Sequence, residues 1–360
     1  MNGPERFLLG ERRLAAWINE GGKPQAAAWR WRLLSRWYAW WGDKLARAQE
    51  DMLAKQGLGV RPAIAPLFIM GFWRSGTTLV HEWAGAVSAY AGPQTWQCFA
   101  PRTFRLMPPP DAKVVGRPMD GGTIGTTSPQ EDEFALLLLG EPSLYRGFVD
   151  PRRLRSLGEE LLGNAAQPTR MPPAWLRFLA AVEQQGGAPL VLKSPNHIFR
   201  LGALLAEFPG SRFVWVGRDA EQVWRSNVNM WQKMSRQYGL WSAGATEFES
   251  FVTQAMEAYV RALEFALEHL PPGQVCWLDY ERCIAEPADA IRSLMTFAGN
   301  APGEQMGTAS QQAARIATAH PPLPSARQSG AGTPPPAALV ERVQALHRRA
   351  AAQWTTRSVA

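Results

Sequence analysis

Residues 66–83 read PLFIMGFWRSGTTLVHEW, and this stretch decides how the chain folds. The apolar run from Leu67 to Met70 predicts a short buried strand, and the residues from Thr77 onward predict a helix. Between them, Gly71 and Gly76 allow a tight turn in which successive backbone N–H groups converge, and the positive end of the helix dipole adds to their effect. The stretch therefore predicts a loop that binds a phosphate-like anion.

The side chains of this loop fit an anion, but the loop differs from the P-loop of nucleotide triphosphatases. Arg74 supplies a guanidinium fork, and Thr77 and Thr78 supply hydroxyl donors. The P-loop of nucleotide triphosphatases has the pattern G-x-x-x-x-G-K-[ST], and here both the spacing and the lysine differ. No acidic strand end that would hold magnesium is evident. The loop therefore argues against a kinase or an ATPase.

A second stretch, SRFVWVGRDAEQVWRSNVNMW at residues 211–231, has the same strand–loop–helix pattern. Its strand delivers Arg218, and Ser226 follows about two helical turns later, a spacing that can bring both side chains to one anion. The alternative is purely structural: Arg218 forms an ion pair with Asp219, which caps the helix. Because the pair follows a separate anion loop, we interpret it as a second phosphate site.

Strands and helices alternate through the middle of the chain, which predicts an α/β fold: a P-loop-like parallel sheet with helices on both faces. The expected strands are Leu67–Met70, Leu190–Leu192, Phe213–Val216 and Val275–Leu278. The expected helices are about Thr77–Ala89, Asn196–Phe208, Glu221–Trp231, Thr246–His269 and Ala288–Ala298. A long Pro/Gly-rich section, about 92–188, looks like an insertion on the acceptor side.

Taken together, these motifs resemble those of the sulfotransferases that use 3′-phosphoadenosine-5′-phosphosulfate (PAPS). The loop RSGTT and the later RD…S are similar to that family's 5′-phosphosulfate and 3′-phosphate loops. SPQEDEFALLLLG (128–140), PLVLKSPNH (189–197) and WLDYERCIAEPADAIRSLMTFAG (277–299) are similar to its bacterial branch, which is distantly similar to the tyrosylprotein enzymes. The resemblance covers about 64–299. The glycine-rich 3′-phosphate motif of the cytosolic branch is not evident, and SARQSGAG, with Arg327 and Ser329, is our candidate for its replacement.

The resemblance implies a donor site and a reaction. Arg74, Ser75, Gly76, Thr77 and Thr78 would hold the 5′-phosphosulfate of PAPS, while Arg218, Ser226 and Arg327 would hold its 3′-phosphate. The sulfuryl group would pass in line to a hydroxyl or amine of a small acceptor, leaving adenosine 3′,5′-bisphosphate, with no metal required. Positioning and charge stabilisation dominate such transfers.

Two kinds of group are needed at the reacting centre. A cation must stabilise charge on the departing oxygen, and the candidates are Arg74 and Lys193, which follows a strand end where catalytic groups of open α/β sheets gather. A base must take the acceptor's proton. Glu131 is the first candidate and His197 the second, and Gln97, which cannot act as a base, is a candidate for orienting the acceptor.

An alternative for Glu131 stays open. Ser128-Pro129-Gln130-Glu131 also matches a capping box with proline in the first helical position, in which Glu131 serves the helix alone. The corresponding functional alternative is a non-catalytic nucleotide- or lipid-binding protein that keeps the donor site. A P-loop kinase is a less favoured alternative.

The ends of the chain predict three regions. Residues 1–60 form a helical, Trp- and Arg-rich segment, 61–300 the α/β domain, and 301–360 a Pro-rich segment with a last helix near 339–354. The N-terminal helix packs on the core or on a second subunit in a homodimer, or it rests on a membrane or lipid acceptor. The acceptor pocket is expected between 94–104, the Glu131 helix and this segment.

Composition and charge limit the cellular compartment and the kinds of ligand that we expect. The chain has 360 residues, a net charge of +7 and three scattered cysteines. An odd cysteine set fits a reduced cytoplasm, and the charged N-terminus differs from a signal peptide. The positive charge suits an anionic ligand or a membrane surface, whereas no nucleic-acid-binding motif is found. We therefore predict a cytoplasmic protein, with or without peripheral membrane contact, that acts on a small, apolar or lipid-like acceptor.

Overall fold

The structure is a computed structural model, and it describes residues 29–87, 89–116, 123–163, 165–167, 169–299 and 334–355. Its centre is a four-stranded sheet of β1 (Leu67–Met70), β4 (Val191–Lys193), β5 (Arg212–Gly217) and β6 (Val275–Asp279). The strand order is β4-β1-β5-β6 and every neighbouring pair is parallel. The predicted α/β fold with a parallel sheet and flanking helices is confirmed.

Strand β1 is buried on both faces because its side chains alternate between two apolar clusters. Leu67 and Ile69 join helices α4 (Thr77–Val87) and α14 (Pro287–Ala298) on one face. Phe68 and Met70 join the larger cluster on the other face, which includes α11 (Ala220–Tyr238), α12 (Ala245–His269) and α16 (Ala337–Trp354). Each large apolar side chain buried in this way contributes roughly 1.5–3 kcal/mol to the fold.

The strand order sets the position of the site. Because β1 lies between β4 and β5, the chain leaving β1 at Gly71 has Lys193 on one side and Arg218 on the other. All three segments follow the carboxyl ends of parallel strands, so they meet at one edge of the sheet.

The insertion folds mainly into short helices, although its composition is rich in proline and glycine. It also holds a small antiparallel pair, β2 (Val114–Gly116) with β3 (Thr123–Gly125). Its helical elements are α5 (Thr95–Cys98), η1 (Phe104–Leu106), α6 (Asp132–Leu138), α7 (Arg146–Val149), η2 (Pro151–Arg153), α8 (Leu154–Leu161) and α9 (Pro173–Gly186).

One predicted helix is divided in two. Over 196–208 the structure has a 3₁₀ turn, η3 (Pro195–Arg200), followed by α10 (Leu201–Glu207). Ser194 caps the turn by accepting a hydrogen bond from the Asn196 N–H, and the His197 N–H donates to the Ser194 carbonyl three residues back. The tighter i→i+3 bonding is typical of short connections.

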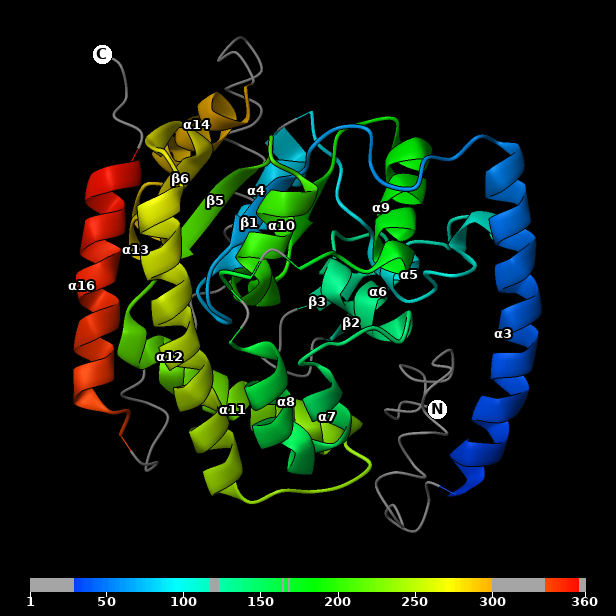
Figure 1. The fold of residues 1–360 in the computed structure, drawn as a ribbon, viewed down its shortest axis with the longest axis horizontal. Helices are drawn as coiled ribbons and strands as arrows, with labels where there is room; N and C mark the ends of the chain where they lie inside the picture. Colours follow the sequence, from blue (N-terminus) through cyan, green and yellow to red (C-terminus); the bar gives the residue numbers. More distant parts are fainter. Residues whose placement is uncertain are drawn as a thin grey trace.

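The outer helices lie on opposite sides of the molecule (Figure 1). Helix α3 (Trp29–Lys55) packs on η1, where Gln49 donates to the Pro101 carbonyl and accepts from the Arg105 N–H. Helix α16 lies beside α12 and β6, far from α3. The remaining elements are η4 (Pro272–Gln274) and α13 (Tyr280–Ala285). No described helix combines the length and apolar character needed to cross a membrane.

Candidate active site

The loop after β1 has a conformation that its glycines make accessible. Gly71 and Gly76 have φ angles of +152° and +100°, and Arg74, at +68°, is in the left-handed region as well. A Cβ atom on Gly71 would lie 2.7 Å from the Val216 carbonyl oxygen, and one on Gly76 would lie 2.2 Å from the Tyr280 ring. A left-handed non-glycine residue costs about 1–2 kcal/mol, and such strain gathers at functional sites.

Arg218 lies against this loop and holds it. Its guanidinium donates to the Arg74 carbonyl oxygen at 3.2 Å and to Gln222 at 3.3 Å. It also lies 4.2 Å from the centre of the Tyr280 ring, in a cation–π contact. Asp219 caps α11 by accepting from the Gln222 N–H, as the structural alternative requires, but Arg218 makes its contacts to Arg74, Gln222 and Tyr280.

The two predicted phosphate signatures meet through Arg74 and Ser226. The Nε atom of Arg74 donates to the Ser226 hydroxyl at 3.3 Å, although 152 residues separate them. One small region therefore contains the guanidinium groups of Arg74 and Arg218 and the start of α4 at Thr77 and Thr78. Such a group fits a ligand with several negative charges, because each component favours an anion.

Lys193 follows on the other side of β1, and its ammonium group is almost buried. It lies 2.6 Å from Oε1 of Glu131 and 3.3 Å from the Thr78 hydroxyl. The side chains of Lys193 and Glu131 are 4% and 15% exposed, so Glu131 is the partner with access to solvent. Thr78 belongs to the anion loop, and Lys193 therefore connects that loop with the carboxylate.

Tyr145, just before α7, holds the other oxygen of Glu131. Its hydroxyl donates to Oε2, and the tyrosine is buried. Burial, with the negative charge of Glu131 as a second cause, raises the pKa of Tyr145 well above its ordinary value. The phenol therefore stays protonated and acts as a hydrogen-bond donor. Sequence reasoning missed Tyr145, because a separation of 14 residues across a turn leaves no periodic pattern.

Three consecutive acids have three different sets of partners. Glu131 binds Lys193 and Tyr145. Asp132 binds Nε2 of His197 at 3.1 Å and Nε1 of Trp175 at 2.9 Å. Glu133 binds Ser143, Ser194 and Arg200. Asp132 and Glu133 are fully buried. They anchor α6 to the core and leave Glu131 at its first turn as the carboxylate of the site.

The capping-box interpretation of Glu131 is wrong. Helix α6 begins at Asp132, with Glu131 itself in the N-cap position, and no side-chain cap hydrogen bond forms. Ser128, the expected cap, accepts instead from the Gly125 N–H. The helix starts later than the pattern predicts, and Pro129 forms a β-bridge with Gln94 in place of the first helical position. The Glu131 side chain is therefore not used by its own helix.

Two other predicted residues, His197 and Gln97, make contacts that support the fold. His197 is fully buried between Asp132 and the rings of Phe68 and Trp175, so its ring has no contact with solvent. The Gln97 amide accepts from the Gln94 N–H and donates to Gln185 at 2.8 Å. These two hydrogen bonds hold the Gln97 side chain within the protein, and its role toward an acceptor stays a prediction.

Two predictions on the donor site stay open. Arg327, with its neighbours in SARQSGAG, lies outside the described residues. Within those residues, no group of three or more His, Cys, Asp or Glu side chains is arranged to hold a metal ion.

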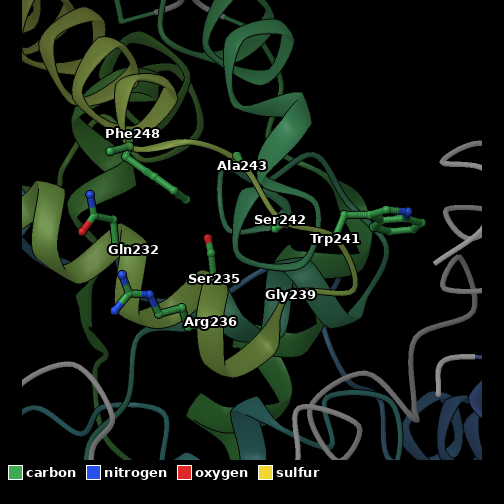
Figure 2. A pocket seen from close by; sticks show the side chains of 9 residues that line it. Gln232, Ser235, Arg236, Gly239, Trp241, Ser242, Ala243 and Phe248 are labelled. Carbon is green, nitrogen blue, oxygen red and sulfur yellow. The ribbon is translucent and has the colours of Figure 1, made fainter. Parts of the chain in front are cut away.

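A pocket of about 330 Å³ lies where α11 ends and α12 begins (Figure 2). Gln232, Ser235 and Arg236 line it from α11, and Phe248 lines it from α12. Figure 2 shows Ser235 and Phe248 pointing into the same space, while the Trp241 ring turns away. None of the residues that we expect in the acceptor wall lines this pocket, so it is separate from that prediction.

Comparison with known proteins shows the family of the chain. A model of the sulfotransferase family matches residues 66–301. The ω-hydroxy-β-dihydromenaquinone-9 sulfotransferases Stf3 of Mycobacterium bovis and Mycobacterium tuberculosis are each 30% identical over 243 residues, which cover 65% of this chain and 62% of theirs. The match thus spans less than two thirds of the length of these relatives.

Solved structures share the fold. Sulfotransferase STF9 of Mycobacterium avium has a TM-score of 0.60 at 19% identity, covering 90% of this chain and 84% of its own. Sulfotransferase STF1 of Mycobacterium tuberculosis has a TM-score of 0.58 at 16% identity, with coverages of 88% and 92%. Because the family model covers more than half of the sequence and includes both loops and the residues between them, the chain belongs to the sulfotransferase family.

Proposed function

We propose that the protein transfers a sulfuryl group from PAPS to a hydroxyl group of an apolar, lipid-like acceptor. The observation that supports this best is the Lys193–Glu131 ion pair beside the anion loop. A cation and a carboxylate lie together beside this loop, which supports a role for Lys193 in stabilising charge on the departing oxygen and for Glu131 in taking the acceptor's proton.

The donor site would use the two joined loops. Residues Arg74 to Thr78 would bind the 5′-phosphosulfate, and Arg218 with Ser226 would bind the 3′-phosphate. When bound, PAPS supplies the sulfuryl group, whose bond to the phosphate oxygen breaks as the acceptor oxygen bonds to sulfur. Arg74 contacts Ser226 and, through its carbonyl, Arg218, so it would keep the two phosphate sites at a fixed spacing.

Glu131 would act as the general base. Lys193 contacts one of its oxygens and Tyr145 holds the other, so its direction is fixed before the acceptor arrives. It would take the proton of the acceptor hydroxyl, while Lys193 would stabilise the negative charge on the departing oxygen. His197 would be a positioning residue, because it holds Asp132 next to Glu131.

The acceptor class rests on similarity of sequence. The name of the Stf3 relatives describes an ω-hydroxylated dihydromenaquinone, a long apolar molecule with a hydroxyl group. A related acceptor, an alcohol on a prenyl or alkyl chain, is our proposal for this chain.

The test is transfer of ³⁵S from labelled PAPS without added metal, using prenyl alcohols, fatty alcohols and phenols as acceptors. Labelled product from a chain alcohol, lost in Glu131→Gln, supports the proposal. Donor binding without transfer to any acceptor would favour a non-catalytic binding protein instead.

A further inference from the structure

Helix α16 follows the region that the family model matches, yet it packs behind the donor loops. Its buried stripe, formed by Leu339, Val343, Leu346, Ala350 and Trp354, faces the core. Trp354 lies 6.0 Å from Trp215 of β5, ring centre to ring centre, so the helix reaches the strand that delivers Arg218. The matched region ends at residue 301, 36 positions before α16 begins at Ala337.

His347 joins α16 to the centre of the sheet by a chain of hydrogen bonds. The Trp215 indole donates to the Tyr259 hydroxyl at 3.2 Å, and that hydroxyl is hydrogen-bonded to Nε2 of His347 at 2.9 Å. Burial lowers the pKa of His347 to about 4, so near neutral pH the ring is uncharged and its Nε2 can accept. The His347 ring also lies 5.2 Å from that of Trp277.

The same residue lies behind the donor loops. A small cavity of about 10 Å³ is lined by Ser75 and Arg218, by Tyr259 of α12, and by Val343 and His347 of α16. His347 and Arg218 thus line the same cavity. A shift of α16 would therefore reach the guanidinium, because packed interiors transmit displacement.

A second contact joins α16 to the helix that carries Ser226. Nε2 of Gln344 donates to Oδ2 of Asp219 at 3.5 Å, and Oδ1 of Asp219 caps α11 by accepting from the Gln222 N–H at 2.8 Å. Gln222 in turn accepts from Arg218. The side chains of α16 are therefore connected to Arg218 in two ways: through this chain of hydrogen bonds and through the shared cavity.

We infer that His347 and Gln344 are positioning residues for the donor's 3′-phosphate: helix α16, outside the matched family region, fixes the orientation of Arg218. This inference rests on the proposed function, since it assigns Arg218 to that phosphate. The C-terminal part of the chain would thus contribute to selection of the donor.

The experiment compares two probes by calorimetry, adenosine 3′,5′-bisphosphate and adenosine 5′-monophosphate. The ratio of their affinities measures recognition of the 3′-phosphate alone. We expect this ratio to fall three- to tenfold in His347→Leu and in Gln344→Ala, with monophosphate binding unchanged. His347→Gln, which keeps an acceptor for Tyr259, should retain most of the ratio, and Arg349→Ala on the exposed face of α16 is the matched control.

The outcomes separate the inference from the proposed function. An unchanged ratio in the folded variants, or an equal loss for both probes, would overturn the role of α16 while the donor assignment stands. A wild-type protein that binds both probes equally would overturn the donor assignment and this inference together. Gln344 is only half-buried, so Gln344→Ala keeps the test valid if His347→Leu does not fold.

Discussion

The ammonium group of Lys193 lies 2.6 Å from the carboxylate of Glu131, and the same ammonium contacts Thr78 of the anion loop. Residues from three separate segments of the chain thus form one continuous polar contact at the edge of the sheet. Since Tyr145 holds the far oxygen of Glu131, the carboxylate has a fixed direction before any ligand binds. Pre-set polar groups of this kind are the main source of electrostatic catalysis.

Replacing Glu131 by glutamine should remove transfer and leave donor binding intact. The amide keeps the shape but cannot take a proton, so we expect kcat to fall by about 10²–10⁴. Steady-state transfer of ³⁵S and calorimetry with adenosine 3′,5′-bisphosphate measure the two effects. Glu257→Gln, on an exposed face of α12, is the control. A Glu131→Gln protein with near wild-type kcat would rule out Glu131 as the base.

Replacing Lys193 by methionine should reduce kcat by about 10²–10³, because the departing oxygen loses its cation. The same change leaves Glu131 without its ion-pair partner. We therefore expect the double variant Lys193→Met/Glu131→Gln to be much less impaired than the product of the two single effects. Multiplicative losses in single-turnover rates would show that the two residues act independently.

Replacing Gly76 by alanine should damage the loop itself. The new methyl group would lie 2.2 Å from the Tyr280 ring, at a φ of +100° that alanine rarely adopts. We expect the free energy of unfolding to fall by about 1–3 kcal/mol or more, together with donor binding. Denaturant titration gives the first quantity. Gly163→Ala is the control, since a Cβ atom there meets nothing within 4 Å, and equal behaviour of the two variants would contradict the loop geometry.

Two histidines, the buried His81 and the half-buried His347, should make the fold sensitive to acid. Burial lowers the pKa of His81 to about 3, with Lys193 as a second cause, and burial lowers that of His347 to about 4, both from an ordinary value of 6.5. Above pH 6.5 each ring is neutral in both the folded and the unfolded chain. As the pH falls from about 6.5 to about 4, only the unfolded chain takes up these protons, so the free energy of unfolding falls.

The slope of the free energy of unfolding against pH tests this prediction. Each histidine contributes up to about 1.4 kcal/mol per pH unit in this range. His347→Gln should therefore unfold with a shallower pH dependence between 6 and 4.5 than the wild type, measured by urea titration at several pH values. Identical slopes would show that His347 is protonated in the folded protein.

The four strands were predictable from sequence because each is a short apolar run bounded by turn residues. The turns that follow β1 and β5 were predictable for a related reason: Gly71, Gly76 and the strand ends impose a local geometry that does not depend on distant residues. Their meeting was not predictable from spacing alone. The contact of Arg74 with Ser226 arises because β1 and β5 are neighbours in the sheet, which only the strand order reveals.

The insertion was the least predictable part. Its helices are short, and their stability comes from packing, as with Trp175 of α9, which is fully buried and donates to Asp132. Tyr145 and His347 escaped prediction for the same reason. Each acts through one hydrogen bond to a residue that the fold brings near, and no local motif marks such a contact.

The central claim, a PAPS site built from two joined loops, is tested most directly by calorimetric titration with adenosine 3′,5′-bisphosphate in the absence of added metal. The account predicts tight binding by the wild type and a loss of at least tenfold in Arg218→Ala, because a charge-assisted contact to the 3′-phosphate is removed. A folded wild-type protein that does not bind this nucleotide, or an Arg218→Ala protein that binds it equally well, would contradict the account.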